Sequence, residues 1–118
     1  MDLQVQQLDG GIERVTISGR LDSAGVQEID HRLSALTAAR QAFVLIDLSQ
    51  VPFLASIGIR TLLTNARVLR QHGGKMVLLN PQALVEEVLK VTGIEAIIPV
   101  FHDLEAASAA LKAPAAGS

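Results

Sequence analysis

The chain has 118 residues and a mass of 12.5 kDa, which is the size of one ordinary domain that buries its own core. Cysteine is absent, so a disulfide framework, a thiolate metal site and a cysteine nucleophile are excluded. A net charge of −2 and only three aromatic residues, all Phe, are not typical of a nucleic-acid-binding protein. We find no signal peptide and no run of roughly 18 apolar residues, so we expect a cytoplasmic protein without membrane insertion.

The first 18 residues are typical of an antiparallel hairpin. Apolar and polar residues alternate from Leu3 to Gln7, and apolar residues return at Ile12, Val15 and Ile17. Between the two runs, Asp9-Gly10-Gly11 is a turn signal. The hairpin is therefore the first predicted element.

After the hairpin, patterns typical of helices and strands alternate. The first predicted elements are a helix capped by Asp22 and Ser23 with its apolar face at residues 26–36, a central strand over Ala42–Leu48, and a helix from Ile57 to about Gln71 stopped by Gly73-Gly74. They are followed by a strand over Lys75–Leu79, a helix capped by Asn80 that carries Leu84, Val85, Val88 and Leu89 and ends at Gly93, a short strand over Ile97–Phe101 with Pro99 in it, and a helix from Asp103 to about Leu111. This order predicts an α/β fold with a mixed sheet of about five strands and four helices packed against it. We expect one domain over residues 1–112 and a frayed tail over residues 113–118.

The usual signatures of catalysis are missing. The three histidines, His31, His72 and His102, form no HxxxH or HxH pair, which argues against a metal site. There is no GxSxG, Walker or GxGxxG motif, so we expect neither an enzyme nor a cofactor. Asp47, near the end of the central strand, resembles a receiver phosphoacceptor, but the acidic pair and the lysine of a receiver are absent; we interpret it as a buried carboxylate that accepts backbone hydrogen bonds.

The most informative segment is the connection between the central strand and the second helix. Ser56 lies where that helix begins, so it is either an N-cap or an exposed hydroxyl open to phosphorylation. Gly58, just inside the helix, costs about 0.5–1 kcal/mol relative to Ala and suggests the close approach of another surface.

The charges around Ser56 favour a phosphate. No Asp or Glu occurs between Leu48 and Val85, whereas Arg60, Arg67, Arg70 and Lys75 all lie in that stretch. Arg60 lies one helical turn after Ser56, and Arg60, Thr64 and Arg67 share one face. That face is either simply solvated or part of a site that tolerates phosphate.

The run DLSQVPFLASIGIRTLL, residues 47–63, resembles the signature of STAS domains, a family that includes the bacterial anti-sigma factor antagonists. Its usual pattern is Asp-Leu-Ser followed by Phe-x-Asp-Ser-Ser-Gly-Leu. Three further motifs agree with the family in order along the chain: Gly19-Arg20-Leu21-Asp22, Gly73-Gly74-Lys75 and Val91-Thr92-Gly93-Ile94.

The resemblance implies a regulator that switches partners. Such a protein binds an anti-sigma factor, often a serine kinase, and so frees a sigma factor; the kinase then inactivates it by phosphorylating the serine that aligns with Ser56, and a metal-dependent serine phosphatase restores it. Two positions depart from the pattern, because Ala55 replaces the signature Asp and Ile57 replaces the second Ser. The residues that we expect at the partner surface are Asp22, Ser23, Leu54, Ala55, Ile57, Gly58, Arg60, Thr64 and Arg67.

Two other functions remain open at this point. The chain could be a constitutive STAS subunit of a membrane transport system, with Ser56 only a helix cap, or a small-molecule sensor, which its short loops disfavour. The hairpin edge and the edge at Pro99 are both candidates for the pairing of two copies in a weak homodimer.

Overall fold

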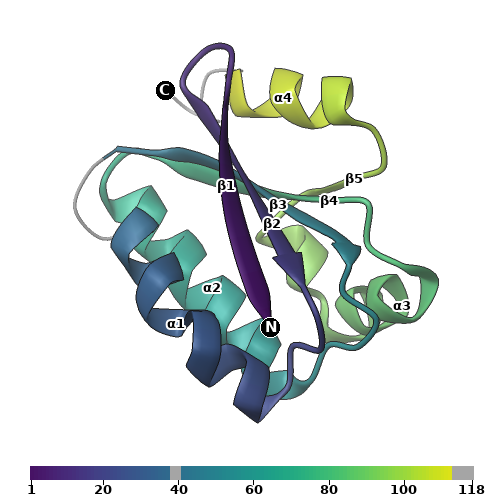
Figure 1. The fold of residues 1–118 in the computed structure, drawn as a ribbon. Coiled ribbons are helices and arrows are strands. Elements are labelled where there is room, and N and C mark those ends of the chain that lie inside the picture. Colours follow the sequence, from purple (N-terminus) through teal and green to yellow (C-terminus); the bar gives the residue numbers. More distant parts are fainter. Residues whose placement is uncertain (38–40, 113–118) are drawn as a thin grey trace.

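The computed structural model describes residues 1–37 and 41–112, and the predicted frayed tail lies outside them. One five-stranded sheet has the order β1-β2-β3-β4-β5, in which β1 and β2 are antiparallel and the other pairs are parallel (Figure 1). The strands are β1 (Asp2–Leu8), β2 (Ile12–Ser18), β3 (Phe43–Gln50), β4 (Lys75–Leu79) and β5 (Val100–Phe101). The predicted hairpin and the buried central strand are confirmed.

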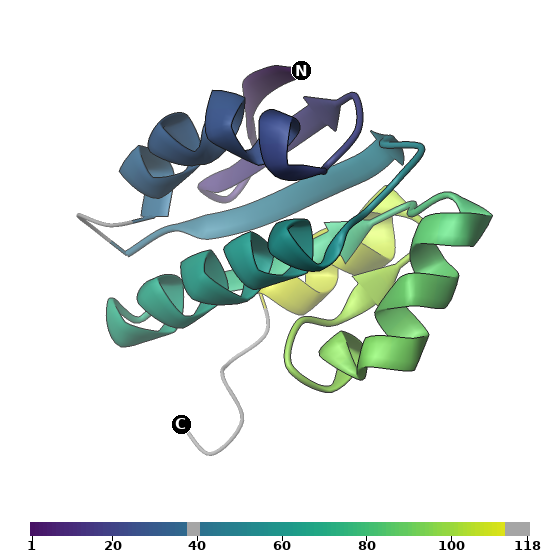
Figure 2. The same ribbon diagram turned by 90° about the horizontal axis from the view of Figure 1, so that it is seen from below.

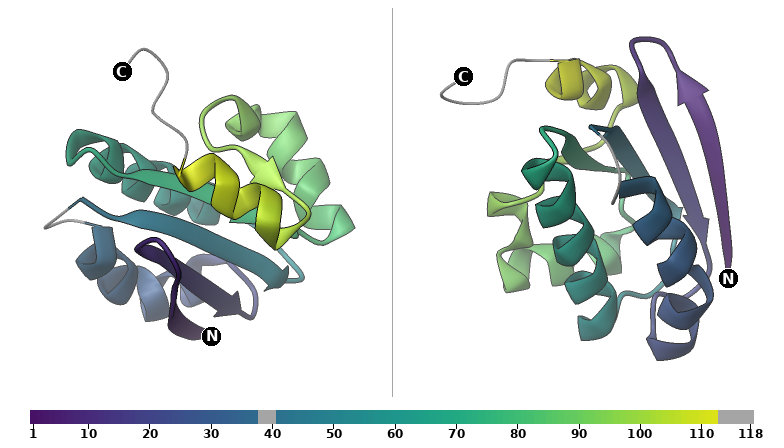
Figure 3. Two further views of the ribbon diagram at one scale, coloured as in Figure 1. Left: turned by 90° about the horizontal axis from the view of Figure 1, so that it is seen from above. Right: turned by 90° about the vertical axis from the view of Figure 1, so that its left-hand side faces the viewer.

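The helices lie on both faces of this sheet. They are α1 (Ser23–Thr37), α2 (Ser56–Gln71), α3 (Ala83–Thr92) and α4 (Leu104–Lys112). Helices α1, α2 and α3 bury their apolar residues in the larger core, whereas Ala107 and Leu111 of α4 pack in a second core with Leu45 and Val77. Figures 2 and 3 show α4 on the opposite side of the sheet from α1 and α2. The mixed α/β fold with four helices is therefore confirmed.

Two predicted boundaries are wrong. Asn80 does not cap α3: it has a left-handed φ of 52°, its N–H donates to the Phe101 carbonyl at 2.8 Å, and the N-cap of α3 is Gln82. The last strand shortens to Val100–Phe101, because the N–H groups of Ile97 and Ile98 donate to the Ile94 carbonyl at 2.9 and 2.8 Å in the 3₁₀ turn after α3. Pro99 lies beside β4, where its carbonyl accepts the Leu78 N–H at 2.9 Å.

Candidate functional site

Two connections of the chain, β2–α1 and β3–α2, are held together at one end of the sheet. The Leu21 N–H donates to the Phe53 carbonyl at 2.9 Å, and the Ala55 N–H donates to the Leu21 carbonyl at 3.0 Å. These bonds form an isolated parallel bridge between Leu21 and Leu54. The start of α2 is thereby fixed against the chain segment that leads into α1.

Ser56 is the first residue of α2, and its side chain is exposed. The N-cap is Ala55, in an extended conformation with φ −89° and ψ 168°, and no side chain caps the helix. The interpretation of Ser56 as a helix cap is therefore wrong. A hydroxyl that forms no side-chain hydrogen bond within residues 1–37 and 41–112, and that lies at the positive end of a 16-residue helix, is chemically suited to accept a phosphoryl group.

Gly58 is explained by the chain's own packing. It is buried, and a Cβ at this position would lie 2.7 Å from Leu54 Cδ1 and 2.9 Å from the Leu21 carbonyl oxygen. The close approach that the sequence suggested is thus intramolecular. Gly58 holds the start of α2 against the β2–α1 connection and presents no side chain to a partner.

The other expected surface residues divide into exposed and buried groups. The exposed residues are Ser23, Ile57, Arg60, Thr64 and Arg67, Asp22 and Ala55 are half-buried, and Leu54 is buried with Gly58. Within residues 1–37 and 41–112, no ion pair or side-chain hydrogen bond engages Arg60 or Arg67. Both guanidinium groups therefore add positive charge to the surface of α2.

Asp22 caps α1, as its sequence position predicts. The Gly25 N–H donates to Asp22 Oδ1 at 2.9 Å, and this hydrogen bond, with a weaker contribution from Arg20, lowers the pKa of Asp22 below its ordinary value. The Arg20 guanidinium carbon lies 4.2 Å from the centre of the Phe53 ring, which is a cation–π distance. Asp22, Arg20 and Phe53 thus form a connected polar and aromatic border beside the start of α2.

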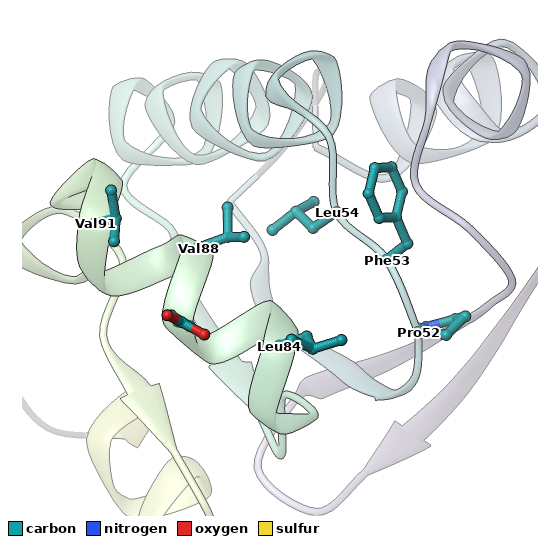
Figure 4. A pocket seen from close by; sticks show the side chains of 7 residues that line it. Pro52, Phe53, Leu54, Leu84, Val88 and Val91 are labelled. Carbon is teal, nitrogen blue, oxygen red and sulfur yellow. The ribbon is translucent and has the colours of Figure 1, made fainter.

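An apolar groove adjoins this border, and the sequence did not predict it. It has a volume of about 350 Å³ and lies between residues 52–54 and the outer side of α3 (Figure 4). Leu54 and Val88 point toward each other across it, and Leu84 and Val91 of α3 are 70% and 82% exposed. Of the apolar residues that the sequence placed on this helix, Val85 and Leu89 are buried and Leu84 lines the groove. The available signal for the groove was the presence of apolar residues on more than one face of α3.

Asp47 lies outside this border and serves the fold. Its Oδ1 accepts the Ser49 N–H at 2.9 Å, and its Oδ2 accepts the Arg14 Nη2 at 2.6 Å. Burial alone would raise the pKa of Asp47, but the hydrogen bonds from Arg14 and Ser49 outweigh it and lower the pKa. The interpretation of Asp47 as a buried carboxylate bonded to the backbone is confirmed, and Arg14 is the partner that sequence reasoning missed.

The described part of the chain contains neither a membrane-spanning helix nor a cluster of metal-ligating side chains. None of its helices is both long and apolar enough to cross a membrane. No group of three or more histidine or acidic side chains in that part could hold a metal ion.

Comparison with known proteins identifies the class of this domain. The STAS domain family matches residues 4–107. BtrV of Bordetella bronchiseptica, a provisionally assigned anti-sigma factor antagonist, is 32% identical over 112 residues, which span 95% of this chain and 96% of BtrV. The chain therefore belongs to the STAS domain family, which confirms the resemblance of its motifs.

Solved structures agree with this assignment. An anti-sigma factor antagonist from Mycobacterium paratuberculosis matches with a TM-score of 0.85 and 24% identity, over 95% of this chain and 94% of that one. SpoIIAA, a Bacillus cell fate determinant solved in its phosphorylated form, matches with a TM-score of 0.66 and 20% identity, over 92% of this chain and 99% of that one. The fold around Ser56 is thus one that anti-sigma factor antagonists share.

Proposed function

We propose that this STAS domain is an anti-sigma factor antagonist that binds an anti-sigma factor with serine kinase activity and is released when that kinase phosphorylates Ser56. The observation that carries the proposal is the exposed position of Ser56 at the first residue of α2, where its hydroxyl does not cap the helix. The relationship to BtrV and the phosphorylated form of SpoIIAA support it. In this role the domain regulates and does not catalyse, and a metal-dependent serine phosphatase restores the binding form.

The surroundings of Ser56 favour a phosphate within this chain. A phosphoserine carries roughly −1.5 to −2 charges, and the N-terminus of a helix carries a partial positive charge. Arg60 lies exposed one turn further along the same helix. Phosphorylation therefore acts on the partner rather than on the fold, through the bulk of the phosphate and repulsion of carboxylates across the interface.

The unphosphorylated partner surface combines a polar border with an apolar anchor site. Along the chain, Ser56 and the exposed Ile57 follow Leu54, which lines the groove, and precede the exposed Arg60 and Arg67 of α2. Apolar contact in such a groove supplies binding free energy, and the surrounding charges select the partner. One added phosphate at this point disturbs both contributions.

The test uses the serine kinase that is recovered with the native protein. We expect incubation with this kinase and ATP to add one phosphoryl group by intact mass, and Ser56→Ala to abolish the addition. Ser108→Ala is the matched control, because Ser108 is a partly exposed serine on α4 that lies outside the expected partner surface, and it should leave the addition unchanged. A mass gain that survives Ser56→Ala, or no gain at all, contradicts the proposal.

A binding measurement completes the test. Ser56→Glu should bind the kinase much more weakly than the wild type, although a carboxylate carries less charge than a phosphate. If Ser56→Glu and the wild type bind with equal affinity, the domain is not switched at this residue and a constitutive assembly role is the better explanation.

A further inference from the structure

Strand β1 lies at the edge of the sheet (Figure 3, right), so every second residue of the strand directs its backbone N–H and C=O groups away from the sheet. The Gly19 N–H donates to the Gln50 carbonyl of β3. In the β2 segment, the backbone N–H and C=O groups of odd-numbered residues therefore point toward β3, and those of even-numbered residues point toward β1. The register of the hairpin places even-numbered residues of β1 opposite even-numbered residues of β2, so these pairs exchange the hydrogen bonds between the two strands. The odd-numbered residues Leu3, Val5 and Gln7 therefore direct their N–H and C=O groups away from the sheet. In agreement, the Arg32 Nη2 donates to the Leu3 carbonyl at 2.6 Å from outside β1.

This edge lacks the features that protect exposed strands from pairing. Exposed edges are usually short, bulged or marked with charges or proline. Strand β1 pairs with β2 over seven residues without a register shift, and from Leu3 to Leu8 it contains neither charge nor proline. The opposite edge, β5, is only two residues long and follows Pro99. Among the described residues, Arg32 alone provides a side-chain hydrogen bond to the outward groups of β1.

The sequence of β1 is compatible with pairing to itself. We propose that two copies of this chain join their β1 strands antiparallel, with the two-fold axis at Val5. Val5 then faces Val5 of the partner subunit, and Leu3 faces Gln7 of the partner subunit. Each of these pairs exchanges two backbone hydrogen bonds, and no like charges oppose each other. Arg32 gives up its bond to Leu3, and the two sheets become one continuous sheet.

This dimer leaves both Ser56 sites free. The start of β1 pairs with Ser18 at the end of β2, which is the end of the sheet that leads to Asp22 and Ser56. A two-fold axis at Val5 therefore places the two Ser56 residues at opposite ends of the joined sheet. The dimer is independent of the proposed switch, and either can fail without the other.

The first experiment measures the mass of the full chain in solution by analytical ultracentrifugation over a wide range of concentration. We expect a dimer that dissociates on dilution. Val5→Pro removes one outward N–H and should give a monomer, whereas Val5→Thr keeps that N–H and should dimerise. Val5→Lys places like charges opposite each other and should also give a monomer, which covers the case in which the proline variant does not fold. A wild-type chain that is monomeric throughout, or a dimer that survives both Val5→Pro and Val5→Lys, overturns the proposal.

The second experiment uses the absence of cysteine. Val5→Cys introduces a single thiol, and directly opposed residues in a hydrogen-bonded pair have Cα atoms about 5.5 Å apart, which a disulfide can span. Leu104→Cys is the matched control, because Leu104 is 38% exposed and Val5 is 41% exposed. On mild oxidation we expect a covalent dimer at much lower protein concentration for Val5→Cys than for Leu104→Cys. Equal rates of cross-linking contradict β1 pairing.

Discussion

Replacement of Gly58 by alanine tests how tightly the start of α2 is held. The added Cβ would lie 2.7 Å from Leu54 Cδ1, 2.9 Å from the Leu21 carbonyl oxygen and 3.1 Å from Leu21 Cβ, whereas ordinary Cβ contacts lie at 3.4–4 Å. The carbonyl cannot withdraw freely, because it accepts the Ala55 N–H at 3.0 Å. The strain must therefore move α2 away from the β2–α1 connection.

The expected change in stability is a balance of three effects. Alanine is favoured over glycine inside a helix by about 1 kcal/mol. Overpacking of a tight site costs typically about 1–3 kcal/mol, and weakening the Ala55–Leu21 hydrogen bond costs up to about 1.5 kcal/mol more. We expect Gly58→Ala to lower the free energy of unfolding by about 1–2 kcal/mol. Urea denaturation measures this as a lower midpoint at an unchanged slope.

A second substitution on the same helix separates propensity from packing. Thr64 is exposed on α2, so Thr64→Ala gains helix propensity without a steric penalty and should raise the free energy of unfolding by a few tenths of a kcal/mol, about the difference between the two propensities. If Gly58→Ala is as stable as the wild type or more stable, the contact with Leu21 does not constrain the start of α2, and the packing explanation of this glycine is refuted.

Two further predictions concern a cap and a buried charge. Asp103 Oδ1 accepts the Glu105 N–H at 2.9 Å and so caps α4, and Asp103→Ala should lower the free energy of unfolding by about 0.5–2 kcal/mol. Ser56→Ala removes no cap and should change the free energy of unfolding by less than about 0.5 kcal/mol. Urea titrations measure both changes. The pKa of Asp47 is lowered by folding, so its contribution to stability is present above its unfolded pKa of about 3.9 and is lost as pH falls through the lower folded value. Unfolding free energies measured from pH 7 downward should therefore fall less steeply below about pH 4 in Asp47→Asn than in the wild type, and equal slopes would disprove the role of this carboxylate.

The sequence predicted the elements whose signals are local. Alternation around Asp9-Gly10-Gly11 identified the hairpin, and the continuous apolar run that forms β3 identified the strand covered on both faces. Asn80 illustrates the limit of such signals. Asparagine is suited both to a helix N-cap and to a left-handed turn, and the choice is made by a hydrogen bond to Phe101, which is distant in the sequence.

The candidate site was predictable in position but not in detail. The family motif located Ser56 at the start of α2. The interpretation of Ser56 as the N-cap was wrong by one residue, because the N-cap of α2 is Ala55. The groove depends on how far α3 stands from residues 52–54, and the pairing of Arg14 with Asp47 joins neighbouring strands 33 residues apart. Distances of this kind follow from tertiary packing, which a single sequence does not display.

The replacement of the family's signature Asp by Ala55 has a consequence for charge at the proposed switch. Because Ala55 is the N-cap of α2, an aspartate there would direct its carboxylate at the first N–H groups of the helix. That carboxylate would compete with a phosphate on Ser56 for the same positive end and would repel it. With alanine the helix end stays available, and Arg60 lies exposed on the next turn. In the proposed switch the substitution therefore favours the phosphorylated form within this chain, and on that proposal the repulsion that ends binding comes from acidic groups of the partner.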